Sequence, residues 1–310
     1  MIKLLRAGFR RYVHSYIFWF ALAMTAGIAV FCGMEARRSY FDDFFVTILL
    51  IVIAVLISWL VGREHEEGFR NKVICGHTKG SVYVSELILG VGVSAILYVL
   101  FVVIFFGLNS YIVGHAPIGV ALRIFLGGLA ASACTAVVLV TVGCMISRRV
   151  VTGIVSILLI LSFVLASETI RSVLDRPEYY EKYDYEYTEV VDEKGNTYFQ
   201  MSIIEGSLRL EPNPDYIKSP IRDVLNVVCH VFPFTPIRDV DRLTDGWFGY
   251  HRQVSSNSVG SSHTLWDHQS DFSVTKEEIT SLTVSIIFTS VEMIFIGCAG
   301  YFLFRKKELK

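Results

Sequence analysis

The stretch that decides the fold begins at Phe44 with FFVTILLIVIAVLISWLV and continues from Gly62 to Glu86 as GREHEEGFRNKVICGHTKGSVYVSE. The first part is continuously apolar and approaches the roughly 20 residues with which a helix crosses about 30 Å of hydrocarbon. The second part carries charges of both signs, and a further apolar run begins at Val84. A charged interval between two such runs predicts two membrane-spanning helices joined by a short segment outside the bilayer.

The composition of the whole chain is typical of a membrane protein. The 310 residues are 53% hydrophobic and 18% charged, whereas a soluble domain is nearer one quarter charged. A net charge of −1 gives no reason to expect a nucleic-acid partner. Because the apolar runs are continuous and not alternating, they predict helices and not a β-barrel. The runs are Tyr16–Gly33, Phe44–Val61, Val84–Leu108, Ile118–Ile146, Val150–Ala166 and Ile279–Phe304.

Six crossings place both termini on one side of the membrane, and the positions of lysine and arginine indicate which side. Segments on the side of the termini hold 14 of the 28 Lys and Arg residues, whereas the opposite short loops hold only Arg37 and Arg38. Because positive charge is enriched in short cytoplasmic segments, both termini are expected in the cytoplasm. The basic segments are residues 1–15, 62–83, 147–149 and 305–310.

The expected fold is therefore a membrane all-α fold with six transmembrane helices and a small α+β extracytoplasmic insertion between helices five and six. Residues 1–166 hold the first five helices together with the cytoplasmic segment 62–83. Residues 167–278 form the insertion. Residues 279–310 hold the sixth helix and a basic cytoplasmic tail.

The insertion contains three patterns that predict local structure. Residues 187–203 hold two β-prone runs around a Gly-Asn turn, which predicts a hairpin. Residues 219–232 predict a helix with Ser219 as its cap, lying on the outer membrane surface, capping the bundle or packing in a small outer domain. Residues 241–275 are rich in serine and aspartate and are expected to form a loop.

The charged interval after the second apolar run predicts a short helix. Phe69, Val73 and Ile74 are interpreted as one apolar face, and Gly76 is placed to end the helix in the left-handed conformation. Apolar side chains with a polar rim suit docking to a cytoplasmic partner. The alternative is a helix that rests on the bilayer, although the acidic residues of the segment gain nothing near anionic lipid.

Residues 67–86, EGFRNKVICGHTKGSVYVSE, resemble the segment that follows the second helix in the six-helix permease subunits of bacterial ABC exporters, the type-2 permease family. In the family pattern, Phe69 stands where a threonine is common, and Thr78-Lys79 replaces Ser-Arg. The matching residues are Glu67, Gly68, Arg70, Asn71, Lys72, Ile74, Gly76, Tyr83 and Ser85.

A second segment, residues 211–237, resembles the part of that family which precedes its last helix. The glycine that the family has before its arginine is absent, and Pro220 occupies that neighbourhood. The matching residues are Asn213, Pro214, Tyr216, Arg222 and Pro233.

The resemblance implies a membrane subunit of an ATP-driven transporter in the bacterial cytoplasmic membrane, exporting a peptide, a drug or another amphipathic molecule. Two permease chains, identical or related, assemble with two ATP-binding subunits. The chain has no phosphate-binding G-x-x-x-x-G-K-[ST] motif, so ATP and Mg²⁺ are expected on the partner and no cofactor or catalytic residue on this chain. The implied contacts with the ATP-binding subunit are Glu67, Phe69, Arg70, Lys72, Val73 and Ile74.

Glu292 is the one further candidate site residue, because it lies midway along the last apolar run. A carboxylate inside a membrane is costly unless it is paired or protonated, so Glu292 either lines a substrate path or fixes helix packing. A zinc site among the histidines and aspartates of the insertion matches no ligand spacing, so no metal is expected. The candidates for that site are His251, His263, Asp267, His268 and Asp271.

Two other functions stay open at this point. A membrane-bound sensor or immunity protein would bind an extracellular peptide through residues 167–278 and would need no ATPase. An intramembrane hydrolase would need catalytic polar residues at one depth, and Glu292 alone does not supply them.

Overall fold

The computed structural model of the protein describes most of the chain and contains six long apolar helices where the sequence predicts membrane spans. Each of the six is long and apolar enough to cross a membrane. They are α2 (Tyr16–Glu35), α3 (Asp43–Glu67), α5 (Lys79–Ile112), α6 (Ile118–Met145), α7 (Arg149–Leu174) and α10 (Lys276–Lys306). The described residues are all those outside 36–42, 113–117, 147, 175, 183–184, 192–196, 204–208, 232–249, 258–260, 269–275 and 308–310.

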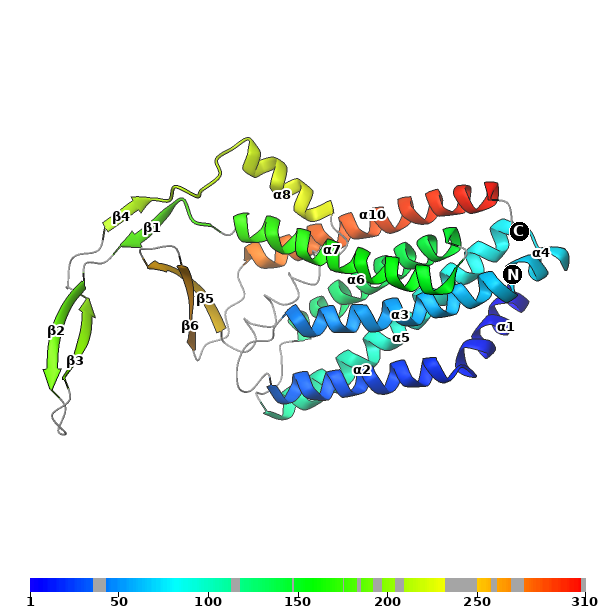
Figure 1. The fold of residues 1–310 in the computed structure, drawn as a ribbon, viewed down its shortest axis with the longest axis horizontal. Helices are drawn as coiled ribbons and strands as arrows, with labels where there is room; N and C mark the ends of the chain where they lie inside the picture. The colour runs from blue at the N-terminus through cyan, green and yellow to red at the C-terminus, as the bar shows by residue number, and fades with distance from the viewer. Residues whose placement is uncertain are drawn as a thin grey trace.

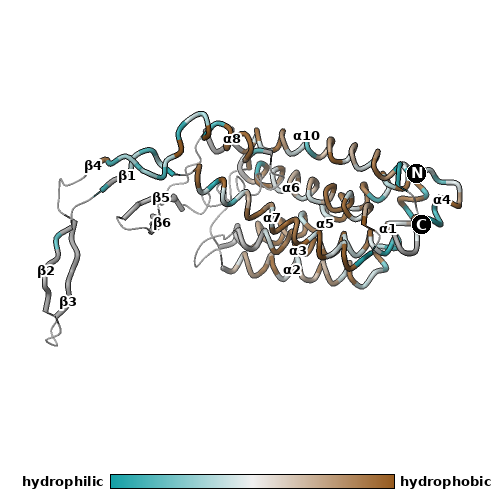
Figure 2. Tube along the Cα trace, turned by 45° about the horizontal axis from the view of Figure 1, so that its top comes forward, coloured by the Kyte–Doolittle hydropathy of each residue, from teal (hydrophilic) through white to brown (hydrophobic). Residues whose placement is uncertain are grey.

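The six helices run side by side as one elongated bundle (Figure 1). Both chain termini lie at one end of the bundle together with the short helix α4 (Phe69–Ile74), and the strands lie beyond the opposite end. In Figure 2 the brown, hydrophobic residues concentrate along the helices, whereas teal residues gather near the two ends. This arrangement places the two polar regions of the sequence on opposite sides of an apolar layer, as a membrane-spanning chain requires.

Helix α7 is longer than the apolar run that predicted it. The run ends at Ala166, but the helix continues to Leu174. Its last turns pack against α8 (Ile221–Val231), and Ser167 and Arg171 are buried there. The helix therefore extends about two turns beyond the apolar run, because tertiary packing stabilises turns that the run does not include.

The N-terminal residues form a helix that the sequence analysis missed. Helix α1 (Ile2–Val13) turns across the end of the bundle before α2 begins (Figure 1). Leu4, Gly8 and Tyr12 are buried and pack toward α5. Their spacing of four residues is the signal that would have revealed this face, but the basic residues between them obscured it.

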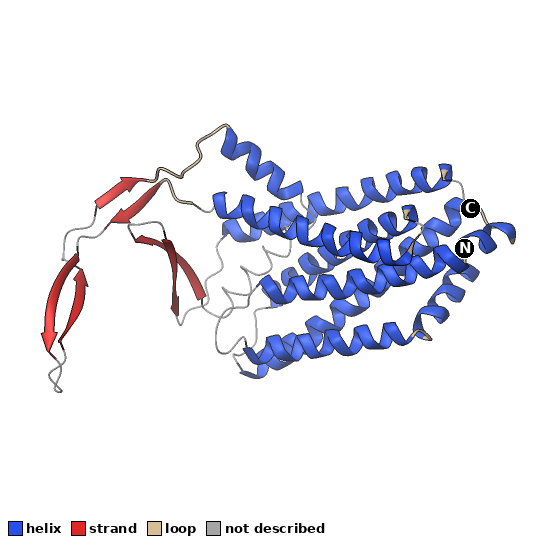
Figure 3. Cartoon of the chain, viewed as in Figure 1, coloured by secondary structure: helices blue, strands red, loops and turns tan. Residues whose placement is uncertain are grey.

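The insertion is built from antiparallel pairs of strands, drawn red in Figure 3. The pair β2–β3 confirms the predicted hairpin. In the sequence β1 precedes this hairpin and β4 follows it, and these two strands form a separate antiparallel pair. The strands of the two pairs are β1 (Tyr179–Lys182), β2 (Tyr185–Val191), β3 (Thr197–Ile203) and β4 (Arg209–Pro212).

The expected loop at 241–275 was partly wrong, because it contains the pair β5 (Tyr250–Asn257) and β6 (Ser261–His268). Serine, threonine and histidine gave these segments a loop-like composition. The strands nevertheless form, because backbone N–H and C=O groups of one strand hydrogen-bond with those of the other. His251 and Asp267 are cross-strand partners, whereas His263 pairs with Ser255 further along the ladder. Asp271 of the considered zinc site lies outside the described residues.

Helices α5 and α10 contact each other through a reciprocal arrangement of tyrosine and glycine. Tyr83 of α5 lies over Gly300 of α10, and Tyr301 of α10 lies over Gly80 of α5. The Tyr83 hydroxyl also forms a 2.8 Å hydrogen bond with Thr141 of α6. A Cβ atom on Gly300 would overlap that hydroxyl, so this position requires glycine.

We expect Gly300→Ala to destabilise the purified chain by about 1–3 kcal/mol, because the added methyl group displaces Tyr83. Gly92→Ala is the matched control, since a Cβ atom at Gly92 meets no other atom within 4 Å. The midpoint of thermal unfolding in detergent should fall for Gly300→Ala and stay unchanged or rise slightly for Gly92→Ala. Equal midpoints for the two variants would contradict the proposed tyrosine–glycine packing.

Candidate functional site

The short helix α4 joins α3 to α5 and confirms the helix predicted in the charged interval. Gly68 separates it from α3, and Gly76 ends it with a φ of 91°. At this end the Gly76 and His77 amides donate to the carbonyls of Val73 and Lys72, at 3.0 and 3.1 Å. This pair of hydrogen bonds is the Schellman motif, in which the residue with positive φ is usually glycine.

Phe69 anchors α4 to the bundle and does not face outward as predicted. Its side chain is 1% exposed, and its ring meets the ring of Phe304 edge-on with centroids 5.3 Å apart. Ile74, which was placed on the same face, is 71% exposed. A separation of five residues rotates a side chain by about 140° around a helix, so the two cannot share a face.

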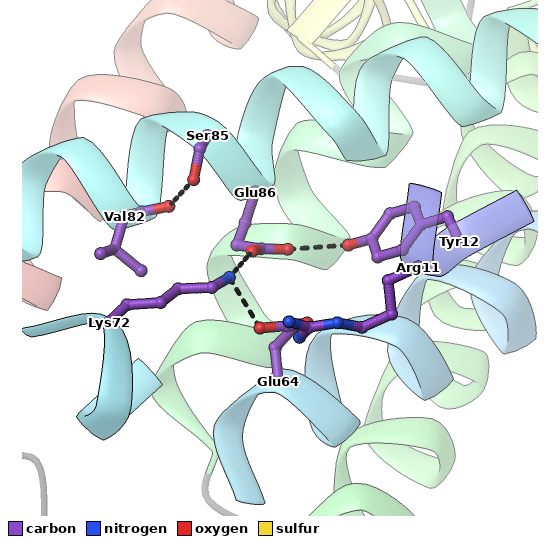
Figure 4. Close-up of polar contacts among 7 residues, drawn as sticks. All are labelled: Arg11, Tyr12, Glu64, Lys72, Val82, Ser85 and Glu86. Atoms are coloured by element: carbon purple, nitrogen blue, oxygen red, sulfur yellow. Dashed lines mark hydrogen bonds and ion pairs between the residues drawn. The ribbon is translucent and has the colours of Figure 1, made fainter. Parts of the chain in front are cut away.

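Lys72 is the centre of a buried polar cluster (Figure 4). Its ammonium lies 2.6 Å from a carboxylate oxygen of Glu64 on α3 and 2.7 Å from one of Glu86 on α5. Both carboxylates are 1% exposed, and the lysine side chain is 13% exposed. One cation therefore joins the short helix to the two membrane-spanning helices that flank it in the sequence.

Helix α1 completes the cluster with two adjacent residues. The Tyr12 hydroxyl donates a 2.7 Å hydrogen bond to the second oxygen of Glu86, and Arg11 pairs with Glu64. Burial, and next the nearby Glu86 carboxylate, raise the pKa of Tyr12 well above its usual value of 10. Tyr12 therefore stays protonated near neutral pH and remains a hydrogen-bond donor.

The charges of this cluster balance, and this balance is what permits its burial. Arg11 and Lys72 supply two positive charges against the two carboxylates of Glu64 and Glu86. Removing an ion from water costs several kcal/mol, so a buried carboxylate persists only with close partners. Gly68 also belongs to this packing, because a Cβ atom there would overlap the carboxylate of Glu64.

The C-terminal tail and the start of α7 are held at the same end of the bundle. Lys307 donates to the carbonyls of Cys144 and Met145 at 3.0 and 2.8 Å, which caps the last turn of α6. Burial lowers the pKa of Lys307 from 10.5. Arg149 places its guanidinium over the ring of Trp59, 4.6 Å from the centroid, and so joins α7 to α3.

The structure separates the six predicted partner contacts into inward and outward residues. Phe69 and Lys72 are committed to contacts inside the chain, and Val73 is half-buried. Arg70 and Ile74 are exposed. The side chain of Glu67 lies outside the described set. The exposed residues of α4 are therefore Arg70, Asn71 and Ile74.

Sequence reasoning missed Glu64, Glu86, Arg11 and Tyr12. Glu64 closely follows the run that ends at Val61, and Glu86 lies near the start of the run that begins at Val84. A charged residue in such a place is usually interpreted as the end of a membrane span. The useful signal was that Lys72 lies between two acidic residues whose helices must meet at one end of the bundle.

Glu292 lies on α10, far from this cluster in the sequence and within the membrane-spanning part. It is partly exposed, and one of its carboxylate oxygens is buried without a hydrogen-bond partner among the described residues. Thr289, one turn earlier, has a buried hydroxyl that likewise has no hydrogen-bond partner among the described residues. Within the described part of the chain, no three His, Cys, Asp or Glu side chains are grouped to hold a metal ion.

Comparison of the chain with protein-family models, curated proteins and solved structures gives no match. The fold and the polar ends of the bundle define a multi-pass membrane protein with six spanning helices.

We expect Lys72→Met to destabilise the protein by about 3–5 kcal/mol, because it leaves two buried carboxylates without a cation between them. Arg70→Met, two residues away on the exposed side of α4, is the matched control and should change stability by less than about 0.5 kcal/mol. Thermal or denaturant unfolding in detergent measures both.

Glu86→Gln should partly rescue Lys72→Met, because it removes the carboxylate that Lys72→Met leaves without a cation, whereas Glu64 keeps its pairing with Arg11. The double variant should then be more stable than the sum of the single effects predicts, by about 0.5–3 kcal/mol. Strict additivity would show that Lys72 and Glu86 are not energetically coupled.

Proposed function

We propose that the chain is the membrane-spanning permease subunit of an ATP-driven ABC exporter in a bacterial cytoplasmic membrane. The observation that carries the proposal is α4, a short helix at the end of the bundle that contacts α3, α5 and α10 and exposes Arg70 and Ile74. The sequence resemblance in residues 67–86 supports the same reading. The end of the bundle that holds α4 and both termini is the cytoplasmic end in this proposal.

The contacts of α4 suit the transmission of force from a partner to the membrane helices. Lys72 connects it to α3 and α5, and Phe69 connects it to α10. Arg11 and Tyr12 extend the connection to α1. Buried charge pairs and ring contacts resist separation, so a displacement of α4 moves these helices with it and does not bend a loose loop.

ATP is hydrolysed by a separate subunit in this proposal, with Mg²⁺ bound there. The outer surface of α4, formed by Arg70, Asn71 and Ile74, docks into that subunit, and Glu67 precedes it in the chain. Ile74 is the apolar residue that a groove would cover, and Arg70 supplies a polar contact at its rim. Phe69 and Lys72 hold α4 in position from the inside.

Two such permease chains, identical or related, enclose the transport path between inward-open and outward-open states. Glu292 and Thr289 have side-chain oxygens without a hydrogen-bond partner among the described residues, at the level of the membrane, which supports a place for Glu292 on the path of an amphipathic substrate such as a peptide or drug.

The proposal predicts that Ile74→Asp and Arg70→Glu abolish association with the ATP-binding subunit while the permease still inserts and folds. Membranes are solubilised in mild detergent, the tagged chain is purified, and the co-purifying subunits and ATP hydrolysis are measured. Wild type should retain a stoichiometric ATPase, and each variant should lose most of it, because a buried charge or a reversed charge disrupts the docked surface.

Ile221→Asp is the matched control, since Ile221 is also an exposed isoleucine but lies on α8. It should retain the ATPase. A wild-type chain that purifies alone, without ATP hydrolysis, would overturn the exporter and would favour a sensor or immunity protein that acts through residues 167–278.

A further inference from the structure

Helix α1 has three distinct faces around its axis. The first face, formed by Leu4, Gly8 and Tyr12, is buried toward α5. The second is apolar and exposed, with Ile2 82% and Phe9 49% exposed. Ile2 and Phe9 lie within about 20° of each other around the helix at 100° per residue, so their side chains form one apolar stripe along it.

The third face is basic and adjoins the exposed apolar stripe. Lys3, Arg6 and Arg10 lie about 40–100° around the helix from Ile2, and all three are exposed. The first acidic residue in the sequence is Glu35, so α1 itself contains no negative charge. Among the described residues, none of these three cations has an ion-pair partner, whereas Arg11 pairs with Glu64.

The position of α1 relative to the first membrane span is set by Trp19. Its indole nitrogen donates a 2.8 Å hydrogen bond to the Val13 carbonyl at the end of α1. Trp19 is 58% exposed, and Tyr16 at the first position of α2 is 74% exposed. Tryptophan and tyrosine concentrate where hydrocarbon meets headgroups, so this contact favours a position of α1 at the depth of the headgroup region.

We propose that the outer face of α1 binds anionic phospholipid. Lys3, Arg6 and Arg10 contact the headgroup phosphates, and Ile2 and Phe9 enter the boundary of the acyl chains. A basic face beside an apolar face is the arrangement of a helix that lies in the membrane surface, and anionic lipid matches its charge. The assignment to the cytoplasmic leaflet rests on the orientation proposed above, but the lipid preference is independent of any ATPase.

The test is native mass spectrometry of the delipidated full-length chain in detergent. Equal amounts of phosphatidylglycerol and phosphatidylcholine with identical acyl chains are added, and the bound lipids are counted. Wild type should retain phosphatidylglycerol preferentially. The variant Lys3→Gln/Arg6→Gln/Arg10→Gln should lower that preference roughly threefold to tenfold, and the single variants should give graded decreases.

The matched control is Arg148→Gln/Arg305→Gln/Lys306→Gln, which removes three exposed cations at the same end of the bundle but outside α1. It should keep most of the preference. The proposal is overturned if the α1 variant binds both lipids as wild type does, or if the control loses the preference equally.

The same variants separate a lipid site from a protein contact. If the α1 variant keeps its lipid preference but loses a co-purifying ATPase, its basic face is a partner surface and the lipid proposal is wrong. If the α1 variant loses the lipid preference and Ile74→Asp alone loses the ATPase, both proposals are supported independently.

Discussion

The cluster around Lys72 is the interaction on which the end of the bundle depends. Two carboxylates from different membrane-spanning helices meet there, and each would be unfavourable in an apolar bundle without a cation. Lys72 can satisfy both only if α4 lies across the ends of α3 and α5. The electrostatic requirement therefore determines where the short helix lies, and Phe69 on Phe304 secures the same position through packing.

The geometry of the cluster also explains the local sequence. Gly68 allows the chain to turn while the Glu64 carboxylate lies against it, and Gly76 allows the chain to leave α4 in a conformation that other residues avoid. Tyr12 supplies the hydrogen bond that the second oxygen of Glu86 needs. The short helix predicted in the charged interval between two spans is thus held by buried ion pairs and by glycine positions on either side of it.

The two ends of the bundle differ in how they are built. At the end that holds the termini, charged groups pair within the chain and the short helix is tied to its neighbours. Beyond the other end, the strands form paired ribbons, and α8 packs against α7 and α10. The exporter proposal uses this difference, because a docking surface needs rigid support whereas an external segment can extend away from the membrane.

The sequence by itself determined the six spans, because the length of an apolar run directly reflects the thickness of hydrocarbon that it must cross. It also determined α4 and the β2–β3 hairpin, since glycines, turn residues and periodicity act within one short segment.

Only the tertiary structure decided that Phe69 faces inward, that Lys72 joins Glu64 to Glu86, and that Tyr12 completes the cluster. Tyr12 and Glu86 are 74 positions apart in the chain. Periodicity reports which residues share a face of one helix, but which face meets which neighbour depends on how several helices pack together.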